Sequence, residues 1–203
     1  MNMKLVDFNV LFDQQVRTLL WQGCPDAAGM KEEQFLRCVE PLGREISEIG
    51  QVPDGYIPFL IVIPDRFVPL RKQMAMLRRN GGAPSVSLNP DALKNAEGVV
   101  TKPVPYLIFD VESGAATRGA APGECVKRFR QEGRCGLTVE EGMALVTHFP
   151  ETLGNHYIDL PGSRYYSDRV PDLWLCDSEP MLSFSWVDLA NALWGSASCG
   201  RRS

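Results

Sequence analysis

A proline-led apolar phrase occurs three times in this chain and constrains the fold more than any other feature. Each copy places a proline just before a run of mostly apolar or aromatic residues. The copies are IPFLIV at 57–62, VPYLIF at 104–109 and VPDLWL at 170–175. Proline has no backbone N–H to donate, so within sheets it stands at strand starts, edges or bulges. The three phrases therefore predict three β-strands, each beginning close to its proline.

The fold class follows from these strands and from the segments between them. Their nearly continuous apolar character is typical of strands covered on both faces, and the intervening segments are long enough to hold helices. With 203 residues, one core is the expectation. We expect an α/β or α+β fold: one layered domain over residues 1–203, with a mixed sheet that contains the three proline-led strands. A helical part at about 7–49 should pack on it.

Helix signals are clearest at three places. Asp7 is a suitable N-cap for a helix over about 7–22, and a second helix is expected over 31–49, kinked or split by Pro41. Thr138 and Glu141 form a capping-box pattern, so a helix should begin there and end near 149–150. Two further helices are expected to begin at Pro69 and Pro122, and the one from Pro69 should end at Gly81 and Gly82. Strands are expected over 157–160 and 181–187. The basic pairs at 71–72 and 78–79 should lie on solvated helix faces.

Charge and apolar patterning argue against several functions, although a local basic patch stays possible. The net charge of -4 gives no electrostatic reason to bind nucleic acid. The longest apolar run, 57–63, is far short of the roughly 20 residues that span a bilayer. Asp7 and Asp13 would interrupt a signal-peptide core, so a soluble cytoplasmic protein without a membrane partner is expected. In that setting the six cysteines should be reduced thiols.

Several segments together resemble a known family. They are LTVEEGMALVTHFP at 137–150, GSR at 162–164, RVPDLW at 169–174 and WGSAS at 194–198. The chain is similar, over most of its length, to an uncharacterised family of bacterial proteins classed only as a domain of unknown function. The resemblance implies no activity, cofactor or site residue.

Cofactor and metal motifs are missing from the sequence. The glycines fit neither the phosphate-loop nor the dinucleotide-binding spacing, and no Gly-x-Ser-x-Gly elbow is present. Cys125 and Cys135 are ten positions apart, unlike the close pairs that anchor structural zinc. We therefore expect no metal and no cofactor.

The segment 162–169 is the best candidate for ligand binding. It places two arginines and two tyrosines in a polar loop before a predicted strand. Arginine and tyrosine offer planar, amphipathic surface to an anionic ligand or a protein. The plainer interpretation is a solvated turn in which Asp168 neutralises an arginine. The candidate residues are Ser163, Arg164, Tyr165, Asp168 and Arg169. A non-enzymatic module that binds a small molecule or a protein is the leading hypothesis.

The alternative is a small-molecule enzyme, a hydrolase or transferase. His148 is one of only two histidines, so a mechanism that needs a neutral-pH base depends on one of them. Its pocket would join His148 to the 162–169 loop and to the segment that holds Ser196 and Ser198. Trp174, Trp186 and Trp194 near this segment are candidates for an aromatic wall. Helix capping by His148 and core packing by the tryptophans are the plainer interpretations. A structural role, in which exposed C-terminal aromatics pair two copies, is a third possibility.

Overall fold

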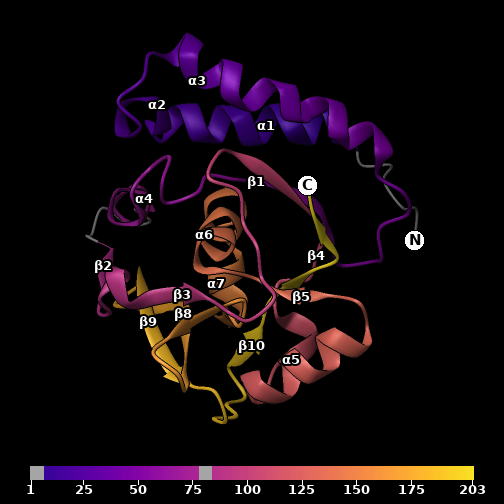
Figure 1. The fold of residues 1–203 in the computed structure, drawn as a ribbon, viewed down its shortest axis with the longest axis vertical. Coiled ribbons are helices and arrows are strands. Elements are labelled where there is room, and N and C mark those ends of the chain that lie inside the picture. The colour runs from indigo at the N-terminus through magenta and orange to yellow at the C-terminus, as the bar shows by residue number, and fades with distance from the viewer. Residues whose placement is uncertain (1–6, 78–83) are drawn as a thin grey trace.

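The computed structural model describes residues 7–77 and 84–203 and has a mixed α/β fold, which confirms the expected class (Figure 1). The predicted helix end at Gly81 and Gly82 and the basic pair Arg78 and Arg79 lie outside the described residues. From top to bottom in Figure 1, the layers are a pair of N-terminal helices, a small sheet, the helix α6 and a larger sheet. Every helix in the described part of the chain is too short or too polar to cross a membrane.

The N-terminal helices form the outer layer. As predicted, Asp7 caps α1 and accepts hydrogen bonds from the amides of Asn9 and Val10. Pro41 splits the second predicted helix into an α-helix and a 3-10 helix, because its ring cannot donate the interior hydrogen bond. The elements are α1 (Phe8–Trp21), α2 (Cys24–Ala27), α3 (Glu32–Val39) and η1 (Glu40–Glu48). Their apolar faces cover β1 (Ile57–Val62).

The Gln15 side chain of α1 is hydrogen-bonded to the backbone at the edge of β1. Its Nε2 donates to the Phe59 carbonyl at 3.0 Å, and its Oε1 accepts from the Ile61 amide at 2.8 Å. The side chain is only 2% exposed. Gln15 therefore takes the place of a neighbouring strand for these two backbone groups.

The smaller sheet contains the first two proline-led strands. β1 pairs antiparallel with β4 (Tyr106–Val111), and β4 pairs antiparallel with β12 (Arg201–Arg202). Phe59 and Ile61 contact the N-terminal helices, whereas Leu60 and Val62 join the main core. Both faces are covered, as the apolar runs predicted. The third proline-led strand lies in the other sheet, so the prediction of one sheet with all three strands was wrong. The apolar character of a segment indicates that it is buried, but it does not indicate which strand pairs with it.

The larger sheet is mixed. β10 is parallel to β6 and β2 is parallel to β9, while the other pairs are antiparallel. The strands are β2 (Ser85–Val86), β3 (Leu93–Asn95), β6 (Tyr157–Asp159), β7 (Ser163–Tyr165), β8 (Arg169–Cys176), β9 (Glu179–Trp186) and β10 (Trp194–Ser196). A third, two-stranded sheet joins β5 (Cys135–Gly136) to β11 (Ser198–Cys199).

The helix α6 (Val139–His148) lies between the two main sheets and is the centre of the core. The predicted capping box is confirmed: the Thr138 hydroxyl accepts from the Glu141 amide and the Glu141 carboxylate accepts from the Thr138 amide. Glu141 is also completely buried and pairs with Arg202 of β12, Oε1 to Nε 2.6 Å. The remaining helices are α4 (Leu70–Met76), η2 (Pro90–Ala92), η3 (Ala115–Thr117), α5 (Pro122–Gln131) and α7 (Thr152–Asn155).

The C-terminal segment 190–203, for which no element was predicted, contributes three short strands to three different sheets. Glycine is needed where β10 passes η3: a Cβ on Gly195 would lie 1.9 Å from the carbonyl oxygen of Gly114. All six cysteines in the structure are free thiols.

Candidate functional site

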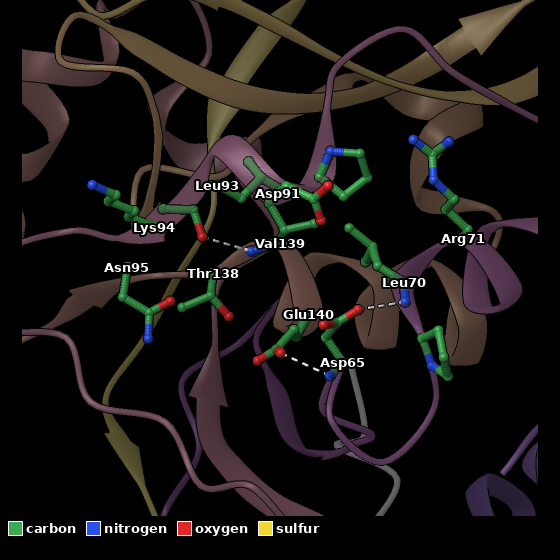
Figure 2. Close-up of a pocket in the computed structure, with 13 residues that line it drawn as sticks. Asp65, Leu70, Arg71, Asp91, Leu93, Lys94, Asn95, Thr138, Val139 and Glu140 are labelled. Carbon is green, nitrogen blue, oxygen red and sulfur yellow. Dashed lines mark hydrogen bonds between the residues drawn. The ribbon is translucent and has the colours of Figure 1, made fainter.

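A cleft of about 380 Å³ opens at the N-terminal end of α6 (Figure 2). Four segments far apart in the sequence form its walls: residues 65–71 at the start of α4, the η2–β3 segment, the first residues of α6, and Ser163 of β7. Its polar lining residues are Asp65, Arg71, Asp91, Lys94, Asn95, Thr138, Glu140 and Ser163. Both charge signs are present in this lining.

Three amides at the start of α6 already donate to groups of the protein. The Thr138 amide donates to Glu141 Oε2 at 2.8 Å, and the Val139 amide donates to the Ser163 hydroxyl at 3.0 Å. The Glu141 amide donates to the Thr138 hydroxyl at 3.3 Å. A free helix N-terminus favours anions, but here these donors are satisfied.

The acidic wall is fixed by backbone hydrogen bonds. Glu140 Oε1 accepts from the Asp65 amide at 2.8 Å, and Asp65 Oδ1 accepts from the Leu70 amide at 2.6 Å (Figure 2). Burial raises the pKa of Glu140, although its hydrogen bond from the Asp65 amide opposes that effect. The wall is thus a preorganised pair of carboxyl groups rather than two mobile surface chains.

Three exposed charges complete the lining. In the view of Figure 2, Arg71 and Lys94 lie at opposite sides and Asp91 lies between them. None of the three belongs to an ion pair in the part of the chain that the structure describes. Each charge is available to a ligand.

The structure divides the predicted 162–169 loop into two parts. Its first half is the strand β7, and only Ser163 of this half lines the cleft. Arg164 is half-buried and donates from Nη1 to the carbonyls of Pro161 at 2.7 Å and Ser163 at 2.9 Å. Tyr165 is buried, and its hydroxyl accepts from the Asn89 amide at 3.4 Å. Arg164 and Tyr165 therefore support the backbone here.

The second half of the loop faces another surface. The Arg169 guanidinium lies 4.8 Å from the ring centroids of both Phe184 and Trp186, while Asp168 is 4.0 Å from its Nε. Tyr166 and Trp186 are 60% and 53% exposed. This aromatic and arginine surface does not belong to the cleft.

The expected pocket between His148 and the 162–169 loop is not formed by the described residues. His148 is at the C-terminal end of α6, whereas Ser163 is bonded to its first turn. His148 Nε2 donates to the Ile61 carbonyl at 3.0 Å, and burial lowers its pKa to about 4. The length of the helix separates the two groups, and the sequence pattern could not reveal this.

Trp194 and Ser196 belong to a different cluster, on the face of the larger sheet opposite α6. The strand register places Ser196, Asp159, Asp172 and Ser183 in one row across four strands. Side chains directly opposite in such rows have Cβ atoms about 4.5–5.5 Å apart. The Ser185 hydroxyl donates to Asp159 Oδ1 at 3.2 Å. Two carboxyl groups therefore meet inside the protein.

This carboxyl pair is poorly satisfied by its surroundings. Asp159 and Asp172 are 2% and 1% exposed. Burial raises the pKa of Asp159 to about 6, and burial followed by the charge of Asp159 raises the pKa of Asp172 to about 8. Asp172 Oδ1 and Ser196 Oγ are buried without a hydrogen-bond partner in the described part of the chain. Burial and the repulsion between the two charges both favour a state in which the pair shares one proton.

An aromatic row accompanies the carboxyl pair. Tyr157 contacts Trp194 and Trp174 with ring centroids 5.1 and 5.9 Å apart. These residues stand two positions before or after the carboxyl row and thus on the same sheet face. Trp186 lies on the opposite face, so the predicted three-tryptophan wall contains only two of its members.

Sequence reasoning missed both carboxyl groups of this pair and all the charged groups of the cleft. One signal was available for the pair, because Asp159 and Asp172 each interrupt an apolar strand. No signal marked the cleft, whose walls come from separate segments. Among the described residues, no group of three or more His, Cys, Asp or Glu side chains is arranged to hold a metal ion.

A family model described as a family of unknown function (DUF5701) matches residues 18–203. No curated protein and no solved structure matches the chain significantly.

Proposed function

Because the chain belongs to the DUF5701 family, whose function is unknown, we propose a function from the geometry of the cleft: a non-enzymatic module that binds a small ligand carrying both a positive and a negative group. A free amino acid or a short peptide has this chemistry. The volume of about 380 Å³ is at the lower end of the usual range for small-molecule sites. In this proposal Ser163 of the 162–169 segment contributes to one wall.

The observation that carries the proposal is the set of unpaired charges around one preorganised wall. Arg71 and Lys94 offer donors to a carboxylate, and Asp91 offers an acceptor to an ammonium group. Because Asp65 and Glu140 are held by backbone amides, little side-chain entropy is lost when a ligand contacts them. Both charge types on a ligand would find partners in one cleft.

A thermal-shift panel of amino acids, dipeptides and neutral sugars tests the proposal. A ligand that binds only the folded state raises the melting temperature by mass action. We expect a shift with a zwitterionic compound that disappears in Arg71→Ala and in Asp91→Asn. Arg37→Ala is the matched control, because Arg37 is also an exposed helical arginine but lies in α3, outside the cleft lining.

Two results would reject this function. One is a panel in which no zwitterionic compound shifts the wild-type melting temperature. The other is a shift that survives equally in Arg71→Ala and Asp91→Asn, which would locate binding elsewhere. The proposal includes a cytoplasmic location in a bacterium, and neither nucleic acid nor a membrane as partner, in keeping with the acidic composition.

The Asp159 and Asp172 pair favours a second candidate, a hydrolase or transferase. A carboxyl pair that shares one proton supplies an acid and a base. Activity should then follow a bell-shaped pH profile with limbs near the pKa values of about 6 and about 8, and vanish in Asp159→Asn. Equal turnover by wild type and Asp159→Asn across a substrate panel would exclude the pair as catalyst.

A further inference from the structure

The two-stranded sheet places two thiols directly opposite each other. Cys135 of β5 and Cys199 of β11 are register partners in an antiparallel pair. Opposite residues in such a pair have Cα atoms about 4.5–5.5 Å apart. Disulfides need Cα atoms about 4.4–6.8 Å apart. The strand register therefore meets the backbone requirement for a disulfide without moving the chain.

The surrounding hydrogen bonds keep this register from slipping. The Leu137 amide donates to the Ala197 carbonyl at 3.0 Å, two positions beyond the cysteines. Arg134, the residue before Cys135, donates from Nε to the Ser198 hydroxyl at 3.0 Å. Arg202 donates from Nη2 to the Gly136 carbonyl at 2.9 Å. Each strand is thus held to the other from both ends of the pair.

The two thiols also differ in their access to solvent. Cys135 is half-buried, whereas Cys199 is completely buried in the main core. Burial raises the pKa of Cys199 and the nearby Glu141 carboxylate raises it further, whereas the guanidinium groups of Arg202 and Arg134 oppose these effects. Cys135 is therefore the thiol that an external reagent meets first.

We propose that Cys135 and Cys199 form a reversible disulfide, with a low-molecular-weight disulfide of the glutathione class as oxidant. The Cys135 thiol loses its proton and attacks the oxidant, so that its S–S bond breaks, a mixed disulfide forms and one small thiol leaves. The Cys199 thiol then loses its proton and attacks the Cys135 sulfur, releasing the second small thiol. Two protein thiols are oxidised by two electrons, and one small disulfide is reduced to two thiols.

The consequence is a covalent link between the C-terminal strands and the segment that enters α6. Cys135 is three residues before Thr138, the N-cap of α6 and part of the cleft lining. The bond would close a loop of roughly 60 residues, which restricts the unfolded chain. Oxidation therefore stabilises the position of the segment that leads into α6, whose first residues line the cleft. This inference is independent of what the cleft binds.

The test uses the full chain, first reduced and then incubated with oxidised glutathione. We expect an intact mass lower by two hydrogens, one cross-linked Cys135–Cys199 peptide, and a melting temperature about 5–10 °C higher, all reversed by dithiothreitol. Cys135→Ser and Cys199→Ser should each abolish the cross-link. Cys38→Ser, at another half-buried cysteine, should retain it.

The peptide map of the wild-type protein decides the case even if a cysteine variant does not fold. Two thiols that stay free at Cys135 and Cys199 would overturn the proposal. A Cys135 that only accumulates glutathione, or a bond between other cysteines, would overturn it as well.

Discussion

Replacing Asp172 with asparagine should stabilise the protein, and more so at higher pH. Asp172 is 1% exposed and lies opposite Asp159, so its ionised form is costly in the folded state. Asparagine has nearly the same shape, carries no charge, and can donate its amide to the Asp159 carboxylate. The substitution thus removes a buried charge without opening a cavity.

The sign and size follow from the pKa of Asp172. It is raised from 3.8 to about 8, so between these pH values the folded state binds the proton more tightly than the unfolded state. Stability therefore falls as pH rises through this window and levels off above it. At about 1.4 kcal/mol per pKa unit, the ionisation of Asp172 costs at most about 4 kcal/mol between pH 5 and pH 8. Because the two carboxyl groups titrate together, we expect the Asp172→Asn advantage to grow by about 2 kcal/mol over that range.

Urea denaturation of wild type and Asp172→Asn at pH 5 and pH 8 measures this difference directly. Asp13→Asn is the control, because Asp13 is exposed on α1 and should change stability equally little at both pH values. The slope of unfolding free energy against urea concentration must stay constant for the comparison to hold. An Asp172→Asn protein that gains no more stability at pH 8 than at pH 5 would refute the argument.

Three further predictions concern the elements that hold the fold together. Gln15→Leu leaves a buried carbonyl and a buried amide of β1 unpaired, so it should lower the unfolding free energy by about 2–3 kcal/mol in urea titrations. The control, Gln14→Leu at the exposed neighbouring position, should change the unfolding free energy by less than about 0.5 kcal/mol. Equal losses in the two variants would contradict this prediction. Glu141→Gln leaves the buried charge of Arg202 without its carboxylate partner, so it should lower the unfolding free energy by about 3–5 kcal/mol in the same titrations. A loss below about 1 kcal/mol would be inconsistent with a buried ion pair. Gly195→Ala should yield little soluble folded protein on gel filtration, because its Cβ would overlap a backbone oxygen at 1.9 Å, and a wild-type melting temperature would disprove that close approach.

Local signals in the sequence were sufficient for the main elements. The proline-led phrases predicted β1, β4 and β8, and the alternating pattern before Val187 predicted β9. The Thr138 capping box predicted the start of α6, because side chain and backbone satisfy each other within four residues. Each of these features depends on neighbours in the chain and can be inferred without knowing the fold.

The two-residue and three-residue strands near the C-terminus had no such signal. β10, β11 and β12 are too short to show a period, and they are strands only because β6, β5 and β4 offer ladder partners. The same holds for Gln15, which looks like an ordinary polar helix residue until the edge of β1 lies beside it. Elements of this kind are made by distant partners.

By itself, the sequence determined which segments are apolar enough to be buried, where helices begin, and that the charge balance is acidic. The tertiary structure alone decided which of those segments are neighbours: it separated His148 from Ser163 and brought Asp159 to Asp172 and Cys135 to Cys199. The physical reason is that the interactions involved act over different distances along the chain. Helix caps and side-chain periods act over a few residues, whereas strand register is set by the packing of α6 between two sheets, to which residues throughout the chain contribute.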